Sequence, residues 1–553
     1  MANGGVKPTK SMSLSVRLLR IGRTIDESLR DDHELEERPS EAGRLFVGQA
    51  PALPPTWIDF VSSFAAGGLG RRLVNQSCAA VLFLEVVPDD KSSTTRIMAL
   101  TFGTAHHSLD PDAFERNFGL KVVLNSVARS NLRSLDIATL DATTFQKRIQ
   151  ASRDADFQGF GVDVDRDLLR LAAGSPKDNS FAKSLAGRDA LTLHTKTSPD
   201  DVIEKCRTAL KLYHATDYKK DFGFIDFVTP VRQQFLLEQL DAAAFDELRL
   251  LVTGGMSDLH IALPDILSPE EAVEVGYFGV GLKSGRKQAY MQIAIEDYVE
   301  ELKAGQIDDI ADMAQLRASH EVRVIADGEG DKKHKRKLYD CFVYELTHKG
   351  ETYVLFAGDW FVVDKTFYAA VEADFLKLLA KKVFVPSTKC KNERDFIAEL
   401  DTHKDLLNLD QVKLSPAGAP GANLEPCDFL SRARQFIHLK DGHGSAPISH
   451  LWNQGVVSAE SFIRDEKFRT DLRKEVKKRQ TRSKKAGFDA ILPDGRSKPI
   501  PAEYTVVFGI MRDRYKRSGT ISLPFFSKVS LRSIADRIQL MGFPVEVHLV
   551  ERA

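Results

Sequence analysis

Three side chains with catalytic potential lie close together in the sequence between residues 425 and 440. Asp428 ends the segment EPCD, and His438 and Lys440 close the apolar run QFIHLK. Residues two apart in a strand project from the same face, so a strand over 435–440 would present His438 and Lys440 together. If Asp428 lies on the neighbouring strand and faces the same way, the three side chains converge. Such a set suits metal-dependent hydrolysis of a phosphodiester bond.

Each of these residues has a distinct expected role in that chemistry. Asp428 would anchor a Mg²⁺ ion, with Glu393 or Glu425 as the second carboxylate, because Mg²⁺ keeps several waters and needs few protein oxygens. Lys440 would polarise the attacking water or neutralise charge on the phosphate. His438 could bind a softer ion such as Mn²⁺, hydrogen-bond the phosphate, or act as a base. The alternative is an ordinary charged hairpin edge, since short patterns of this kind also arise by chance.

The elements that must position these residues are predicted over 390–553. ERDFIAELDTHK reads as a helix, LLNLDQVKL as a strand, and LEPCDFL with QFIHLK as a hairpin. A long helical region with a break at Gly455 follows. AEYTVVFGIM, VSLRSIADRIQLMG and VEVHLVE then read as a strand, a helix and a strand. The predicted order is therefore helix, three strands, helix, strand, helix, strand.

This order of elements, with an acid on the second strand and X-x-Lys on the third, resembles the core of PD-(D/E)XK nucleases. Within them it is most similar to the Mrr-type restriction branch, in which Gln often takes the second acidic position. The matching segments are EPCD and IHLK, followed by DGHGSAPISHLWNQG, and the resemblance covers about the last 165 residues. It implies that Asp428, His438 and Lys440 are catalytic and that Asp428, Glu393 and Glu425 hold Mg²⁺ or Mn²⁺. The chain departs from the pattern at His438, where a carboxylate or amide is usual.

The full chain also resembles a sporadically distributed bacterial family of about 550 residues that has no described function. The segments TFGTAHHSLDPDAFERNFGLKVVLNS, RDLLRLAAGSP and SHLWNQGVVSAE carry this resemblance. Sporadic distribution implies horizontal transfer, which suits antiphage or restriction-like roles.

The basic residues concentrate in the last third of a chain whose overall net charge is −1. From residue 381 onward there are 31 Lys and Arg against 21 Asp and Glu, so the remainder is acidic. A basic region on an acidic body favours a polyanionic partner. We therefore expect nucleic acid, with DNA favoured over RNA, to contact Arg473, Lys474, Lys477, Lys478, Arg479, Arg482, Arg514 and Lys516. The alternative is a solvated basic helix face.

The rest of the chain predicts further domains, because 553 residues are too many for one core. Residues 1–185 read as an α+β domain, with a hairpin over 78–103 and a short helix, a turn and a strand over 112–127. Residues 186–320 read as mainly helical, 321–385 as a β meander followed by a helix, and 386–553 as the nuclease-like domain. The expected fold class is a multidomain α/β and α+β protein, with a mixed N-terminal region and a restriction-endonuclease-like α-β-β-β-α-β core.

Composition limits the remaining options. No stretch of 18 or more apolar residues occurs, so no membrane span is expected. The five cysteines are scattered without a CxxC motif, which argues against a zinc finger or a disulfide framework and favours the cytoplasm.

Two functions remain open from the sequence. The first is a cytoplasmic defence protein whose C-terminal domain is a metal-dependent nuclease. The second is a catalytically degenerate protein of the same fold that binds nucleic acid or acts as a scaffold in a defence complex. A homo-oligomer or a partner protein of the defence system is expected in either case. Lys440 and Asp428 favour the first function, whereas His438 favours the second because it removes a carboxylate.

Overall fold

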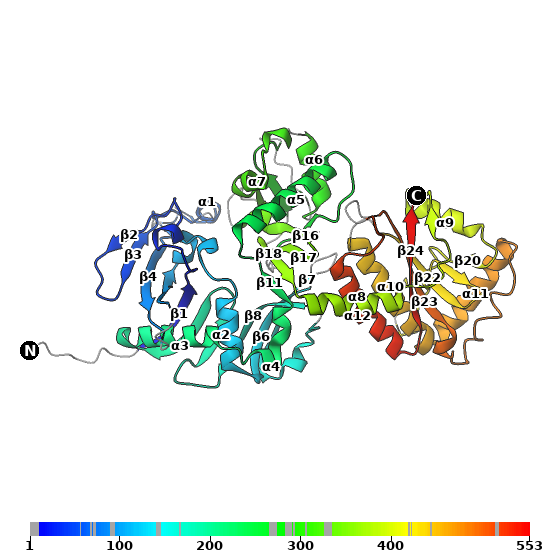
Figure 1. Cartoon of the computed structure of the whole chain (residues 1–553), viewed down its shortest axis with the longest axis horizontal. Coiled ribbons are helices and arrows are strands. Elements are labelled where there is room, and N and C mark those ends of the chain that lie inside the picture. The colour runs from blue at the N-terminus through cyan, green and yellow to red at the C-terminus, as the bar shows by residue number, and fades with distance from the viewer. Residues whose placement is uncertain are drawn as a thin grey trace, which may run out of the picture. The chain divides into compact units, whose positions relative to one another are not determined.

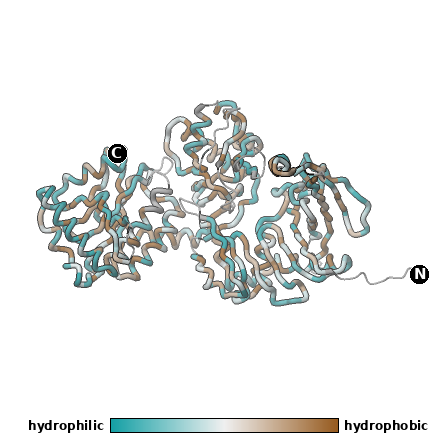
Figure 2. Tube along the Cα trace, turned by 180° about the vertical axis from the view of Figure 1, so that it is seen from behind, coloured by the Kyte–Doolittle hydropathy of each residue, from teal (hydrophilic) through white to brown (hydrophobic). Residues whose placement is uncertain are grey.

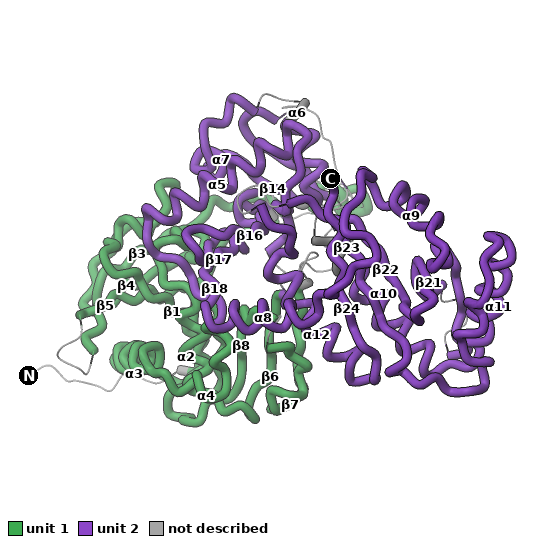
Figure 3. The backbone as a smooth tube through the Cα atoms, turned by 45° about the vertical axis from the view of Figure 1, so that its right-hand side comes forward, with its two compact units in different colours: residues 1–138, 146–226 green, residues 139–145, 227–553 purple. Residues whose placement is uncertain are grey.

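The structure is a computed structural model in which the chain forms two compact units (Figures 1 and 3). One unit comprises residues 1–138 and 146–226, and the other comprises residues 139–145 and 227–553. The structure describes residues 10–55, 57–66, 69, 73–88, 94–139, 145–164, 167–264, 274–282, 290, 293–304, 307–325, 334–418, 421, 423–442, 445–514 and 519–553. The predicted mixed α/β multidomain class is confirmed. The finer division into four segments stays a prediction.

The first unit is built on a ten-stranded sheet in the order β2-β3-β4-β5-β1-β10-β9-β8-β6-β7. Its strands are β1 (Lys10–Leu18), β2 (Glu36–Arg38), β3 (Arg44–Gln49), β4 (Cys78–Val86), β5 (Arg96–Gly103), β6 (Val127–Thr139), β7 (Phe145–Ala155), β8 (Asp167–Pro176), β9 (Ser184–Gly187) and β10 (Leu191–Thr197). The helices of this unit are α1 (Ile58–Ser62), α2 (Phe118–Ser126), α3 (Val202–His214) and α4 (Lys219–Phe222). The predicted hairpin over 78–103 is the antiparallel pair β4–β5.

The prediction of a strand within 112–127 is wrong, because GLKVVLNS lies in helix α2. Nearly every residue of α2 is buried, so its apolar residues do not repeat along one face and the segment reads equally well as a buried strand. The helix packs tightly on the turn after β9, where a Cβ on Gly119 would lie 2.1 Å from the carbonyl oxygen of Ala190. Tertiary packing therefore decides the conformation of this segment.

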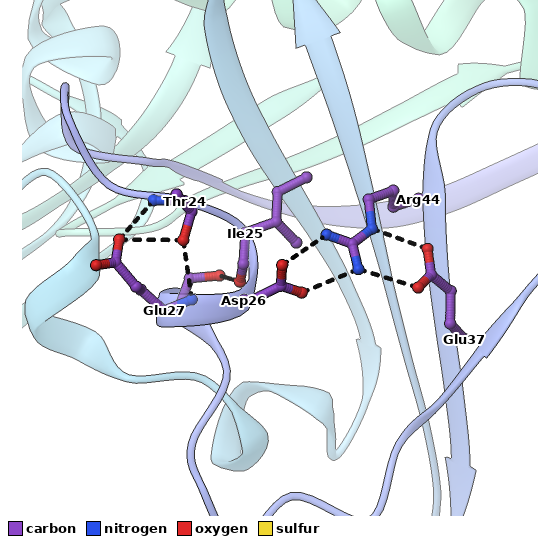
Figure 4. Close-up of polar contacts among 7 residues, drawn as sticks. Thr24, Ile25, Asp26, Glu27, Glu37 and Arg44 are labelled. Atoms are coloured by element: carbon purple, nitrogen blue, oxygen red, sulfur yellow. Dashed lines mark hydrogen bonds and ion pairs between the residues drawn. The ribbon is translucent and has the colours of Figure 1, made fainter.

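A charged contact on the surface fixes the β2–β3 hairpin beside a short helix at Asp26–Ser28 (Figure 4). The Arg44 guanidinium donates to both carboxylate oxygens of Glu37, at 2.8 and 3.0 Å, and to Asp26 at 3.2 Å. These side chains are well exposed, so solvent screens the contact and its main effect is to orient the hairpin.

The second unit begins with a mixed region over 227–378. Its five-stranded sheet has the order β11-β18-β17-β16-β12 and its three-stranded sheet the order β13-β14-β15. The strands are β11 (Val228–Pro230), β12 (His260–Ile261), β13 (Glu274–Phe278), β14 (Glu321–Ile325), β15 (His334–Lys337), β16 (Phe342–His348), β17 (Glu351–Phe356) and β18 (Asp359–Val363). The helices are α5 (Gln234–Val252), α6 (Ile295–Ala304), α7 (Met313–Ser319) and α8 (Lys365–Leu378).

The C-terminal part of the second unit is a six-stranded sheet in the order β19-β24-β23-β22-β21-β20. The strands are β19 (Ser387–Thr388), β20 (Leu406–Asn408), β21 (Phe429–Ser431), β22 (Gln435–Asp441), β23 (Thr505–Arg512) and β24 (Val545–Arg552). β20, β21 and β22 pair antiparallel, whereas β22, β23, β24 and β19 pair parallel. The helices are α9 (Glu393–Asp401), α10 (Ser445–Arg464), α11 (Glu466–Arg482) and α12 (Phe525–Leu540). From α9 onward the order agrees with the predicted one, with α10 and α11 in place of the single helical region, whereas β19 was not predicted.

Helices cover both faces of this sheet, so its strands read as continuous apolar runs. Phe396, Ile397 and Leu400 of α9 pack on one face with Ile437 and Leu439. α10 and α12 pack on the other face with Phe436 and Phe508 of β22 and β23. Phe375 and Leu378 of α8 belong to that second core, so the C-terminal sheet shares its interior with the region before it. Figure 2 shows hydrophobic residues along the strands of both units.

The predicted break at Gly455 does not occur, because α10 runs without interruption from Ser445 to Arg464. Gly455 allows close packing of the helix and does not interrupt it. A Cβ built there would lie 2.5 and 2.6 Å from ring atoms of Phe508, and the Trp452 ring packs edge-on to that same ring with centroids 4.8 Å apart. The absence of a side chain lets α10 approach the strand that neighbours β22.

Gly455→Ala is therefore expected to destabilise the protein. Alanine favours the helix by about 1 kcal/mol, but overpacking against a buried ring costs about 1–3 kcal/mol. The expected net loss of stability is therefore up to about 2 kcal/mol, measured as a lower midpoint of urea unfolding. Val457→Ala, at a 40% exposed position of the same helix, is the control and should change stability by less than about 0.5 kcal/mol. A rise in stability for Gly455→Ala would contradict this account of the packing.

Candidate functional site

Asp428 lies directly before β21 and is held by three hydrogen bonds. Its backbone N–H donates to the carbonyl oxygen of Ile437 at 2.9 Å, and its carbonyl accepts from the N–H of Leu409 at 2.7 Å. Its side chain reaches across to β22, where Oδ2 accepts the backbone N–H of Leu439 at 2.6 Å. The carboxylate is thereby fixed beside the strand that carries His438 and Lys440.

Glu393 and Lys440 meet at the end of β22. Asn392 caps α9 by accepting the N–H of Asp395 at 2.9 Å, which places Glu393 in the first turn of the helix. Lys440 Nζ donates to Glu393 Oε1 at 3.0 Å, and the backbone N–H of Asp441 donates to Oε2 at 3.2 Å. The Asp441 carboxylate in turn pairs with Arg552 at 2.8 Å. The predicted lysine and the predicted helix glutamate are therefore in direct contact.

Four carboxylates surround this point, and we name Glu393, Asp410, Glu425 and Asp428 the acidic cluster. Burial, and after it the negative charges of the other three members, outweigh the lowering effect of the Leu439 N–H and together raise the pKa of Asp428 to about 7. Burial, followed by the charge of Glu393, also raises the pKa of Asp410. Glu425 accepts a hydrogen bond from Gln454 of α10 at 3.1 Å. Mutual repulsion among these groups would be relieved by a proton or a cation.

Asp410 was not predicted as a site residue. It lies two residues beyond the end of β20, and Lys440 and Arg479 are close enough for their charges to lower its pKa. The one signal in the sequence is an acid directly after an apolar run, LLNLD, which is too common to single out.

His438 lies apart from the acidic cluster. Only 2% of its surface is exposed, its Nε2 lies 3.2 Å from the hydroxyl of Ser458 on α10, and its ring packs near that of Phe508. Burial lowers its pKa to about 4, so the imidazole is neutral near pH 7. The structure therefore brings Asp428, Glu393, Glu425 and Lys440 together and leaves His438 in the core beneath α10.

The acidic cluster offers the hard oxygen donors that Mg²⁺ and Mn²⁺ accept, but those donors are engaged within the protein. Oδ2 of Asp428 and both carboxylate oxygens of Glu393 have hydrogen-bonding partners. In the described parts of the chain, no three His, Cys, Asp or Glu side chains are arranged to hold a metal ion. An ion that keeps most of its water shell would have to displace one or two of these contacts.

The positive charge of several residues predicted to contact nucleic acid is partly neutralised by acidic neighbours on α11. Lys474 pairs with Asp471 at 3.5 Å, and Lys478 and Arg479 pair with Glu475 at 3.2 and 3.3 Å. Arg479 also donates to the carbonyl oxygen of Asp410, so this helix reaches the acidic cluster.

The remaining predicted contacts lie in different surroundings. Arg473 is half-buried, and its charge helps to lower the pKa of Asp494. Lys477 and Arg482 are exposed on α11. Arg514 pairs with Glu551 of β24 at 2.6 Å, and Lys516 lies outside the described residues.

The raised pKa of Asp428 predicts a pH dependence of stability. Because the folded pKa exceeds the unfolded value near 4, ionising Asp428 costs stability progressively as the pH rises from about 4 to about 7. Asp428→Asn keeps an acceptor for the Leu439 N–H and removes the ionisation. Between pH 5 and pH 8, urea unfolding of the wild type should lose about 2–3 kcal/mol relative to this variant. A difference between the two proteins that stays constant with pH would show that Asp428 is already ionised at pH 5.

Comparison with known proteins places the whole chain in one family. No helix within the described residues is long and apolar enough to cross a membrane. No curated protein and no solved structure shows a significant match to this sequence. The model of one family, described as a family of unknown function, matches residues 14–551. The predicted membership in an uncharacterised family is thereby confirmed, and the chain belongs to the DUF6119 family.

Proposed function

We propose that the C-terminal part of the second unit cleaves a phosphodiester bond of nucleic acid with Mg²⁺ or Mn²⁺, in the manner of PD-(D/E)XK nucleases. The observation that carries this proposal is the contact of Lys440 with Glu393 beside the fixed carboxylate of Asp428. The order of helices and strands around these residues supports it, because the acid lies next to the second strand and the lysine on the third.

The metal would bind at Asp428, with Glu393 or Glu425 as a further ligand, and would supply Lewis-acid activation of water and neutralise phosphate charge. The chain itself contributes the position of the charges. The hydrogen bond from the Leu439 N–H holds the Asp428 carboxylate in its orientation. The raised pKa of this carboxyl favours exchange of its proton for a cation. Lys440 is held at the strand end by Glu393 and would move its ammonium from that carboxylate to the phosphate.

His438 has a positioning role in this proposal. It is neutral and buried, so we do not assign it as the base that activates water. Its contact with Ser458 ties β22 to α10 and thereby fixes the position of the strand that carries Lys440. Antiphage or restriction-like defence in the cytoplasm is the biological role that we propose for such a nuclease.

The second proposed function is binding of nucleic acid without cleavage, as a scaffold within a defence complex. Two observations favour it. The position that normally supplies a metal-binding oxygen holds the buried His438, and the carboxylate oxygens of Glu393 are both engaged within the protein. In this case the basic residues of α11 would supply most of the affinity.

Cleavage of DNA and RNA by the full chain with Mg²⁺ or Mn²⁺ separates these functions. Lys440→Met and Asp428→Asn should each lower the cleavage rate by about 100-fold or more, because the first removes positive charge required at the phosphate and the second removes the negative charge that would hold the metal. Lys377→Met, which removes a lysine paired with Asp374 at 2.7 Å on α8, is the matched control and should keep the wild-type rate. Cleavage that survives both site substitutions would exclude this site. Absence of cleavage, together with salt-sensitive binding, would support the scaffold function.

The role of α11 can be measured separately through the salt dependence of binding. Replacing both Lys477 and Arg482 by Gln should weaken binding to a DNA duplex and make the plot of log affinity against log salt shallower by about 2, since each phosphate contact contributes about 0.9. Lys219 and Lys220 of α4, replaced in the same way, are the control and should leave the slope unchanged. An unchanged slope for the α11 variant would remove this helix from the interface.

A further inference from the structure

A cavity of about 560 Å³ lies within the second unit, away from the acidic cluster. Its walls come from the end of α5, from residues 256–258, from β16, from α8, and from residues 512–514 and 520–528 at the end of β23 and the start of α12. Its size is within the range of pockets that hold small molecules. The charged residues of its wall are Glu247, Asp258, Glu345, Glu372, Arg512, Asp513, Arg514 and Lys528.

The basic residues of this wall already have acidic partners. Lys528 is 5% exposed and donates to Glu372 at 2.5 Å. Arg512 pairs with Asp258 at 3.1 Å and donates to the carbonyl oxygen of Gly442 at 2.8 Å. Arg514 is paired with Glu551. A ligand that carries negative charge would therefore have to break existing ion pairs.

Glu345 differs from the other acids of the wall. Its carboxylate accepts the backbone N–H groups of Phe525 at 2.5 Å and Phe526 at 3.3 Å, at the start of α12. Within the described residues, no ion pair joins it to a basic side chain. Burial, with a smaller effect of the charge of Asp258, raises its pKa to about 7 against the lowering effects of the Phe525 and Phe526 N–H groups and of the charge of Lys528. A buried carboxylate without a cationic partner is costly to ionise, so a cation beside it would be strongly favoured.

The same cavity offers a second acid and apolar surface. Glu247 of α5 is half-buried and contributes another carboxylate to the wall. Leu250, Met256 and Leu346 provide apolar surface. Tyr344 and Tyr368 add aromatic rings, which can attract an ammonium group. The lining thus combines carboxylates for positive charge with surface for a hydrocarbon chain.

We propose that this cavity binds a linear polyamine, with one protonated amine against Glu345, another toward Glu247, and the methylene chain against the apolar wall. Within the described part of the chain neither acid forms an ion pair with a basic side chain, and the two ammonium groups would supply such partners. This inference does not depend on the proposed nuclease activity, since the residues concerned are not members of the acidic cluster.

Binding of spermidine to the full chain, measured by titration calorimetry without nucleic acid, tests the proposal. One saturable site is expected, with no binding of 1,8-octanediol, which has a similar chain and no charge. Glu345→Gln keeps one acceptor oxygen, which the Phe525 N–H can use, but loses the charge and the acceptor for the Phe526 N–H, and should weaken binding at least tenfold. Glu247→Gln should also weaken it. Glu351→Gln, on the neighbouring strand β17 and outside the cavity wall, is the control and should bind as the wild type does.

The pH dependence adds a second readout. Because Glu345 must lose its proton to pair with an amine, affinity should fall up to about tenfold from pH 8 to pH 6. The groups that face Glu345 are Asp258, Lys528, Tyr368 and the N–H groups of α12. Absence of saturable binding at millimolar spermidine, or equal affinity in all three Gln variants, overturns the proposal. If Glu345→Gln fails to fold, the comparison of Glu247→Gln with Glu351→Gln decides it.

Discussion

The hydrogen bond from the Leu439 backbone to the Asp428 carboxylate is the contact on which the candidate site depends. Residue pairing between β21 and β22 covers only Phe429 with Ile437 and Leu430 with Phe436. Beyond that short ladder, the side chain of Asp428 serves as the acceptor that a backbone carbonyl would otherwise provide. One carboxylate therefore closes the hairpin and also places charge beside Lys440. Because Asp428 serves both purposes, its carboxylate is buried, which raises its pKa.

The elements of the C-terminal part could be predicted because apolar runs and turn residues alternate clearly along it. The surroundings of each side chain could not. His438 and Lys440 are two apart on one strand, yet one contacts Ser458 in the core and the other reaches Glu393 at the strand end. Helices cover both faces of this sheet, so spacing alone cannot tell a buried face from a functional one. Asp410 joins the site only through folding, because an acid after an apolar run is too common a pattern to identify it.

The binding properties of the last third of the chain also could not be predicted from its net charge. A count of basic residues predicts a surface for a polyanion, but it does not show which basic side chains form ion pairs with acidic ones. On α11, Asp471 and Glu475 pair with Lys474, Lys478 and Arg479, so part of the excess is neutralised locally. Around the cavity, by contrast, the acids exceed the bases that pair with them. The distribution of partners, more than the net charge, determines what each region can bind.

The position of β1 in the first unit has a consequence for how this protein is made. β1 precedes every other described strand in the sequence, but it lies inside the ten-stranded sheet between β5 and β10. Its pairing with β10 cannot form until residue 197 has left the ribosome, which at about 5–20 residues per second takes on the order of ten seconds or more. During that time the apolar residues Leu14, Val16 and Leu18 lack their final partners. The growing chain is therefore exposed to aggregation at β1 until β10 has been made, and a chaperone that binds β1 would act during that interval.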